Sequence, residues 1–220
     1  MSQPKKFDLI AFDWDGTLMD STAHIAASIQ AACRDLSLPV PSTEQASHVI
    51  GLGLHDALAR AVPGIGADQV PQLVERYRFH YLSQDEQLVL FDGAREMLVD
   101  LKQRGYWLAV ATGKSRIGLN RALNATGLAP LFDATRCADE SHSKPNPAML
   151  LQLMDQLGVE ASRTLMIGDT THDLWMAANA QARALGVTYG AHLHEHLTEA
   201  PALGVMHSIE ELHEWLLQHG

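Results

Sequence analysis

The sequence has little cysteine: its two residues, Cys33 and Cys137, form no CxxC pair and lie more than a hundred positions apart. This spacing excludes a disulfide framework or a thiolate zinc site, and it favours a reducing compartment. Long apolar runs are also missing, since none approaches the roughly 18 to 20 residues that a membrane span needs. The segment DLIAFDWD near the N-terminus reaches aspartate before a signal-peptide hydrophobic region can form. We therefore expect a cytoplasmic protein with no membrane partner.

Basic residues are scarce as well. Sixteen lysines and arginines stand against 26 aspartates and glutamates, for a net charge of -10, and no lysine occurs between Lys6 and Lys102. A long electropositive face able to neutralise many phosphates is therefore excluded, and nucleic acid is not an expected partner. With 46% hydrophobic and 19% charged residues, the chain belongs to the globular class.

Short apolar runs recur along the chain and predict buried strands. The first, residues 7–12 (FDLIAF), ends directly in an acidic turn. Further strands are predicted over residues 107–111, 164–167 and 184–187, with a short one over 132–135. Helical spacing predicts helices over residues 94–101, 119–123, 147–157 and 174–182, and a capping box formed by Ser208 and Glu211 opens a last helix. Strands that alternate with helices predict an α/β fold with a doubly wound parallel sheet.

One stretch of about seventy residues interrupts this alternation after the first strand. It carries helical patterns from Ser21 to about Pro39, from Leu54 to Val62 and from Val70 to Tyr81, and no convincing strand. We therefore divide the chain into a core of residues 1–16 and 89–220 and an inserted helical unit of residues 17–88.

Polar residues gather where the predicted strands end. Asp13 and Asp15 follow the first strand, Thr112 the second, and Asp169 the strand at 164–167; Lys144 lies just before a helix. In doubly wound sheets, ligands bind beyond the carboxyl ends of the strands. Two close carboxylates on one side of an extended chain repel each other unless a cation or a shared proton relieves them. A lone DxD is more often a solvated turn, but the joint pattern predicts a single site.

These motifs resemble the signature of the haloacid dehalogenase (HAD) superfamily. The resemblance rests on Asp13-Trp14-Asp15-Gly16-Thr17-Leu18 after an apolar strand, then Thr112, Lys144 in KPNP, and Gly168-Asp169 with Asp173 four residues on. It extends in order over nearly the whole chain and is strongest with the phosphoglycolate phosphatase-like branch. It implies a Rossmann-like parallel sheet core with an inserted α-helical cap domain that sets substrate specificity.

The resemblance also implies a phosphatase mechanism. Asp13 would be the nucleophile that forms an aspartyl-phosphate, which splits one difficult displacement into two. Asp15 would act as general acid and base. Because an anion attacks an anion, charge must be neutralised, and Mg²⁺ is the implied cofactor. The implied phosphate-binding residues are Thr112, Gly113, Lys114 and Lys144, and the implied metal residues are Asp13, Asp15 through its backbone carbonyl, Asp169 and Asp173.

The sequence separates some branches of the superfamily from others. Dehalogenases lack the second acid, which this chain has as Asp15, and phosphonoacetaldehyde hydrolases need a cap lysine, which it lacks. Phosphomutases carry basic residues near the cap loop at Gly51–Gly53, where this chain has Leu54, His55 and Asp56. We therefore expect a phosphatase of a small phosphate monoester, phosphoglycolate-like or a sugar phosphate. A phosphomutase and a catalytically silent binding or regulatory protein remain the alternatives; a receiver domain has its motifs in another order and no insertion.

Other patterns receive weaker interpretations. A P-loop is excluded because position 108 is leucine. His192, His194 and His196 occupy alternate positions and could share one face of a strand, as zinc ligands do. Because no fourth ligand is apparent, a surface segment is favoured over a zinc site. Gly51 and Gly53 either face the active site or form a plain turn. Gln181 replaces a glycine that relatives often place at a helix end, and the helix is expected to end differently there. The orientation of the cap arginines (Arg34, Arg60, Arg76, Arg78) and the choice between monomer and homodimer stay open.

Overall fold

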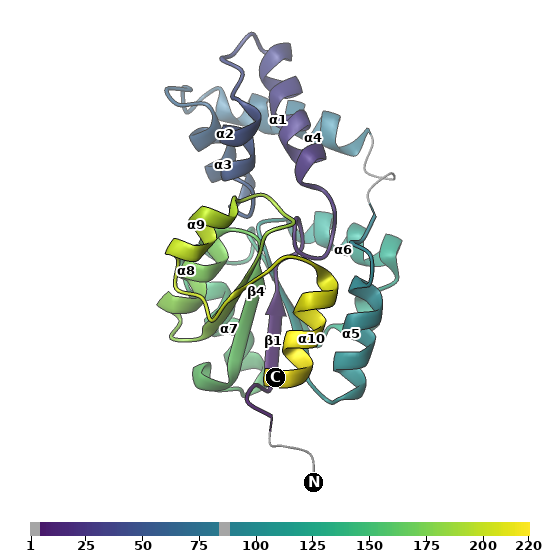
Figure 1. Cartoon of the computed structure of the whole chain (residues 1–220). Coiled ribbons are helices and arrows are strands. Elements are labelled where there is room, and N and C mark those ends of the chain that lie inside the picture. The colour runs from purple at the N-terminus through teal and green to yellow at the C-terminus, as the bar shows by residue number, and fades with distance from the viewer. Residues whose placement is uncertain (1–4, 84–88) are drawn as a thin grey trace.

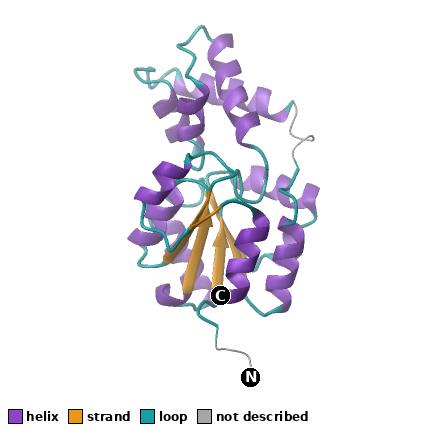
Figure 2. Ribbon diagram, viewed as in Figure 1, coloured by secondary structure: helices purple, strands orange, loops and turns teal. Residues whose placement is uncertain are grey.

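A computed structural model describes residues 5–83 and 89–220, and within them a parallel sheet of six strands forms the centre of the protein (Figures 1 and 2). The strands are β1 (Leu9–Phe12), β2 (Trp107–Thr112), β3 (Ala134–Cys137), β4 (Thr164–Gly168), β5 (Arg183–Val187) and β6 (Val205–Met206). Their order is β3-β2-β1-β4-β5-β6, and every neighbouring pair is parallel. The predicted doubly wound α/β sheet is confirmed. Because the chain reverses its direction of winding at β1, a crevice is expected beyond the ends of β1, β2 and β4.

Helices cover both faces of this sheet, as Figure 1 shows. One face packs against α5 (Ala94–Gln103), α6 (Arg116–Thr126) and α10 (Ile209–His219), and the other against α7 (Ala148–Leu157), α8 (Thr171–Asn179) and α9 (His194–Glu199). Side chains alternate along each strand, so Ile10 and Phe12 enter the first layer and Leu9 and Ala11 the second. Burial on both faces explains why the strands are continuous apolar runs. Among the helices of the described ranges, none combines the length and apolarity required to span a bilayer.

Four further helices form a separate layer over the carboxyl ends of the strands (Figure 2). They are α1 (Thr22–Asp35), α2 (Thr43–His48), α3 (Leu54–Ala61) and α4 (Val70–Leu82). They share a hydrophobic cluster of their own, which includes Ile29, Cys33, Leu58 and Leu73. This arrangement supports the division into a core and a cap of residues 17–88, which stays a prediction; its boundary at residue 88 lies outside the described residues.

Several elements differ from the sequence prediction. Helix α2 was missed, although Ser42 and Gln45 form a capping box that marks its start, and α9 and β6 were missed because they are only six and two residues long. Strand β3 extends over Ala134–Cys137 rather than residues 132–135, and residues 132 and 133 connect it to the short 3-10 helix Ala129–Leu131.

The ends of two helices also correct the prediction. Gln181 has a φ of 60°, so the expectation that the helix avoids the left-handed conformation there is wrong. The backbone N–H of Ala182 donates to the carbonyl oxygen of Ala177 across this turn. This hydrogen bond closes the end of the helix and holds Gln181 in the left-handed conformation, although Gln181 is not a glycine. At α10, Ser208 caps the Glu211 N–H as predicted, but the Glu211 carboxylate accepts from the backbone of His207, so the capping box is not reciprocal.

Candidate active site

The fold brings the predicted polar residues together beyond the carboxyl ends of three adjacent strands. Asp13 and Asp15 follow β1, Thr112 ends β2, and Asp169 follows β4. Two further residues reach the same place from outside the sheet: Asp173 lies in the first turn of α8, and Lys144 lies in the loop before α7. All six side chains are buried. Parallel strands end at one edge of the sheet, which is why residues so far apart in sequence meet here.

Three carboxylates cluster at the centre of this site, and two of them, Asp13 and Asp173, contact the ammonium group of Lys144. Asp13, Asp169 and Asp173 each place an oxygen within 4.8 Å of the others. Lys144 Nζ lies 2.9 Å from Asp13 Oδ1 and 2.5 Å from Asp173 Oδ1, and its side chain is fully buried. Three carboxylates and one ammonium leave two negative charges without compensation when all are ionised. Buried charge of this kind is costly unless a cation or a proton balances it.

The pKa values of these groups reflect that imbalance. Burial raises the pKa of Asp13 well above its usual range. Lys144 acts in the opposite direction, and the nearby carboxylates of Asp173 and Asp169 raise the pKa further. Burial and the neighbouring Asp173 raise the pKa of Asp169 to about 7. For Lys144, burial alone would lower the pKa, but Asp13 and Asp173 outweigh it and hold the pKa above its usual value. A divalent cation beside the carboxylates would restore their ionised forms.

The unsatisfied oxygen of Asp13 indicates the same need. Asp13 Oδ2 is buried, and no hydrogen-bond donor in residues 5–83 and 89–220 reaches it. Buried carboxylate oxygens are normally hydrogen-bonded or bound to a metal. The three-acid cluster therefore fits a cation that prefers oxygen ligands, and it could bind a metal ion.

Hydrogen bonds fix the two acids from β4 and α8. Asp169 accepts from Thr17 Oγ1 at 2.9 Å and from the backbone N–H of Ala191 at 2.7 Å. Asp173 Oδ2 accepts from Thr170 Oγ1 at 2.6 Å, while its Oδ1 faces Lys144. Thr17 belongs to the motif that begins at Asp13, and its hydrogen bond to Asp169 was not predicted from the sequence. The contact from Ala191 is a backbone contact and has no signal in the sequence.

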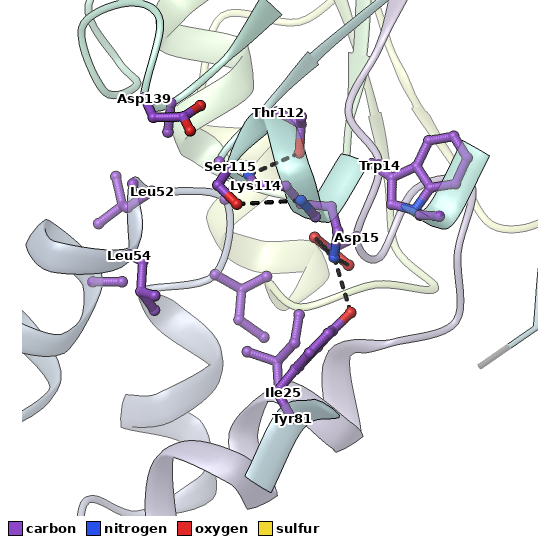
Figure 3. A pocket seen from close by; sticks show the side chains of 18 of the residues that line it. Trp14, Asp15, Ile25, Leu52, Leu54, Tyr81, Thr112, Lys114, Ser115 and Asp139 are labelled. Carbon is purple, nitrogen blue, oxygen red and sulfur yellow. Dashed lines mark hydrogen bonds and ion pairs between the residues drawn. The ribbon is translucent and has the colours of Figure 1, made fainter. Parts of the chain in front are cut away.

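Asp15 lies apart from the acid cluster and has partners of its own. Ser21 Oγ donates to Asp15 Oδ1 at 2.7 Å, and Lys114 Nζ lies 3.0 and 3.1 Å from the two carboxylate oxygens. Figure 3 shows Lys114 beside Asp15, with the Lys114 N–H donating to Thr112 Oγ1 at 3.2 Å. Lys114 was predicted to bind phosphate, and the structure pairs its ammonium group with Asp15. Trp14, between the two acids, is buried in the core.

The cap loop at Gly51–Gly53 faces this site. A Cβ built on Gly51 would lie 3.8 Å from Asp13 Oδ2, and the Gly53 N–H donates to Ser143 Oγ at 2.9 Å. A Cβ on Gly113 would lie 2.4 Å from the carbonyl oxygen of Leu52, a distance that no real Cβ tolerates. Of the two interpretations of this loop, the active-site position is correct. Glycine at position 113 is required by the close approach of the cap backbone, rather than by its own φ.

Replacement of Gly113 by alanine is therefore expected to push the cap loop away from the site. Because small displacements of positioning groups reduce rates steeply, kcat/KM with a phosphate ester should fall on the order of 10²-fold. Steady-state kinetics with thermal unfolding would test this, with Gly127→Ala as the control for a glycine whose Cβ would meet no atom within 4 Å. Gly127 has a φ of 64°, so the control is expected to lower stability while leaving kcat/KM unchanged. Full activity in Gly113→Ala would contradict the close approach.

A cavity of about 840 Å³ lies between the cap and the core. Asp13, Asp15 and Thr112 line it from the core, and largely apolar side chains such as Ile25 and Leu54 line it from the cap (Figure 3). Among the four cap arginines, Arg78 lines this cavity, whereas Arg76 pairs with Asp35 at the surface. A concave, mostly apolar site with a few convergent polar groups is typical of small-molecule binding.

The histidine run matches its prediction only in part, because His194 is exposed whereas His192 is buried. His192 is only 3% exposed, so its interpretation as part of a surface segment is wrong, and it lies in a loop rather than on a strand. Its ring accepts from the Thr171 N–H at 3.2 Å and lies 3.1 Å from the carbonyl oxygen of His48 in the cap, and the His172 ring lies 3.0 Å from the same oxygen. Within the described residues, the acid cluster is the one group of three or more side chains with ligand atoms close enough to share a metal. His172 and His192 thus join α2 of the cap to the core.

Comparisons with known proteins agree with the fold of this chain. The sequence model of a family described as haloacid dehalogenase-like hydrolase matches residues 10–187. A protein named "Probable phosphatase IndB" from Dickeya dadantii is 39% identical, over 93% of this chain and 91% of that protein. A phosphoglycolate phosphatase from Aliivibrio fischeri is 35% identical, over 83% of this chain and 84% of its own length. The crystal structure of a predicted phosphoglycolate phosphatase from Haemophilus somnus superposes with a TM-score of 0.84 at 28% identity, over 96% of this chain and 98% of that one.

Proposed function

Because the chain belongs to the haloacid dehalogenase-like hydrolase family and is a phosphatase, we propose that it hydrolyses a small phosphate monoester through an aspartyl-phosphate on Asp13. The observation that carries this proposal is the state of Asp13. Its Oδ2 is buried and accepts no hydrogen bond from the part of the chain that the structure describes, and it lies next to Lys144 and two further carboxylates on the wall of the cavity. A carboxylate oxygen that nothing else occupies is available to attack phosphorus.

The other residues take roles that follow from their positions. In the first step, an Asp13 oxygen bonds to phosphorus as the ester P–O bond breaks, and Asp15 gives its proton to the leaving oxygen. In the second, Asp15 takes a proton from water, whose oxygen attacks the phosphorus and releases phosphate from Asp13. Lys144 offsets negative charge at Asp13, and Thr112, with neighbouring backbone N–H groups, holds phosphoryl oxygens.

The acid cluster would hold Mg²⁺. Asp13 and Asp169 are the expected ligands together with the backbone carbonyl of Asp15, and Asp173 serves either as a ligand or as the partner that orients Lys144. Mg²⁺ prefers oxygen ligands and usually keeps several waters. When bound, it supplies charge neutralisation for the transferring phosphoryl group.

The helical unit of residues 17–88 would act as the cap that selects the substrate. It encloses the cavity together with the core, which excludes bulk water and favours small esters over folded proteins. Relatives named phosphoglycolate phosphatase support a phosphoglycolate-like ester, and a sugar phosphate is the other class we include.

A panel of phosphate esters assayed with Mg²⁺ tests this function. We expect turnover of at least one small ester, loss of turnover in excess EDTA, and its return when Mg²⁺ is added beyond the chelator. Loss and recovery should exceed about 10²-fold, because removal of the metal takes a divalent counter-charge away from the transferring phosphoryl group. Failure to hydrolyse any ester would reject hydrolysis of a small monoester, whereas hydrolysis that survives complete chelation would reject only the metal.

A further inference from the structure

A contact between the cap and the core surrounds Asp15. Lys114 Nζ lies 3.0 and 3.1 Å from the two oxygens of Asp15 and donates to the hydroxyl of Tyr81 at 2.9 Å. Figure 3 shows the three groups in line, with Lys114 between Asp15 and Tyr81. Asp15 follows β1 and Lys114 follows β2, whereas Tyr81 lies in the last turn of α4. The contact therefore spans two core loops and the cap.

Burial and charge make this contact more than a surface ion pair. The side chains of Asp15 and Lys114 are each 10% exposed, and the Lys114 ammonium group also lies 4.9 Å from the centre of the Tyr81 ring. Burial alone would lower the pKa of Lys114, but Asp15 and Tyr81 outweigh it and hold the pKa above its usual value. Lys114 is thus a charged group whose donors are directed at Asp15 and Tyr81, and charge-assisted hydrogen bonds of this kind are strong and directional.

The contact also fixes the orientation of the Asp15 carboxylate. Lys114 reaches both oxygens, and Ser21 Oγ donates to one of them at 2.7 Å. Tyr81 is held in turn by the cap, since its ring stacks 5.8 Å from that of Tyr77 and its carbonyl oxygen lies 2.8 Å from His24 Nε2. The hydroxyl of Tyr81 can reach Lys114 only while α4 lies over the site.

We propose that Lys114 and Tyr81 are positioning residues that hold Asp15 for its proton transfers, and that the cap hydroxyl completes this arrangement when the cap is closed. The proposal rests on the proposed function, in which Asp15 exchanges protons with the leaving group and with water. It differs from the prediction that Lys114 binds phosphate. A phosphate-binding lysine contributes to substrate affinity, whereas a positioning residue that acts through Asp15 contributes to kcat.

Steady-state kinetics of four variants with p-nitrophenyl phosphate separate these roles. The leaving phenolate needs no proton, so this ester reports mainly on Asp15 as the acceptor of a proton from water. Lys114→Met should lower kcat about 10²-fold and Tyr81→Phe about tenfold, with no rise in KM and with the inhibition constant of inorganic phosphate changed less than about twofold. Lys114→Arg, which keeps the charge, should recover part of the loss. Tyr106→Phe removes a buried hydroxyl just before β2, at the end of that strand away from the cavity, and should match the unaltered protein.

The outcomes distinguish this inference from the function on which it rests. A rise in KM and in the phosphate inhibition constant at unchanged kcat would make Lys114 a phosphate-binding residue and overturn the inference. Equal kcat in Tyr81→Phe and Tyr106→Phe would also overturn it, because the hydroxyl of Tyr81 would then have no role. Tyr81→Phe removes one oxygen atom, so its melting temperature should match that of Tyr106→Phe and keep the comparison valid. Absence of turnover by the unaltered protein, on this ester and on the panel, would instead reject the proposed function.

Discussion

Replacement of Asp13 by asparagine is expected to lower kcat at least about 10⁴-fold, because an amide cannot form the acyl phosphate. The fold should survive the change. Burial already raises the pKa of Asp13 well above its usual range, so a neutral side chain of the same shape suits its surroundings. In EDTA, the variant should unfold at a temperature no lower than that of the unaltered protein, since one of three mutually repelling carboxylates is gone.

Asp20→Asn is the matched control for this variant. Asp20 is exposed and lies at the end of the same β1 loop, so its replacement should leave turnover within about twofold of the unaltered protein, as expected for a surface substitution. Turnover of an ester by Asp13→Asn at the unaltered rate would contradict the nucleophile assignment.

Replacement of Lys144 by methionine should damage both stability and activity. The ammonium group is fully buried between Asp13 and Asp173, and its removal leaves buried carboxylates without a counter-charge. Breaking a buried ion pair from one side lowers the free energy of unfolding by about 3 to 5 kcal/mol. Turnover should fall about 10³-fold, because the charge that offsets the phosphoryl group is lost. Urea denaturation in EDTA and steady-state kinetics would measure the two effects.

Two further variants show whether the lost stability comes from unpaired charge. Adding Asp173→Asn to Lys144→Met removes one of the stranded carboxylates, so it should recover part of the free energy of unfolding but none of the activity. Lys102→Met breaks a partly exposed pair with Asp133 and should cost about 1 kcal/mol or less. If Lys144→Met were as stable as Lys102→Met, the buried cluster would not depend on Lys144 for its charge balance.

The site could be predicted from sequence where a residue's position follows from the end of a strand. Asp13, Thr112 and Asp169 each lie at or just after an apolar run, and the parallel order of those runs places them at one edge of the sheet. Lys144 has no such local marker. Its place among the site residues came from the resemblance to a known family, and the structure puts its ammonium group against Asp13.

What the sequence could not predict depends on how separate elements pack. Tyr81 meets Lys114 because α4 lies over the strand ends, and His192 is buried because α2 covers its loop. Neither contact leaves a periodic signal, since each joins a single residue to a partner far away in the chain. Helix α2 is a different case, because the capping box of Ser42 and Gln45 was present in the sequence and was not used.

Acid quenching during turnover, followed by mass spectrometry of the peptides, tests the central assignment most directly. The unaltered protein, mixed with Mg²⁺ and an ester from the panel, should carry one phosphoryl group on the peptide that contains Asp13, and Asp13→Asn should carry none. Rapid turnover with no phosphoryl group on any peptide, or with the group on another residue, would contradict the account.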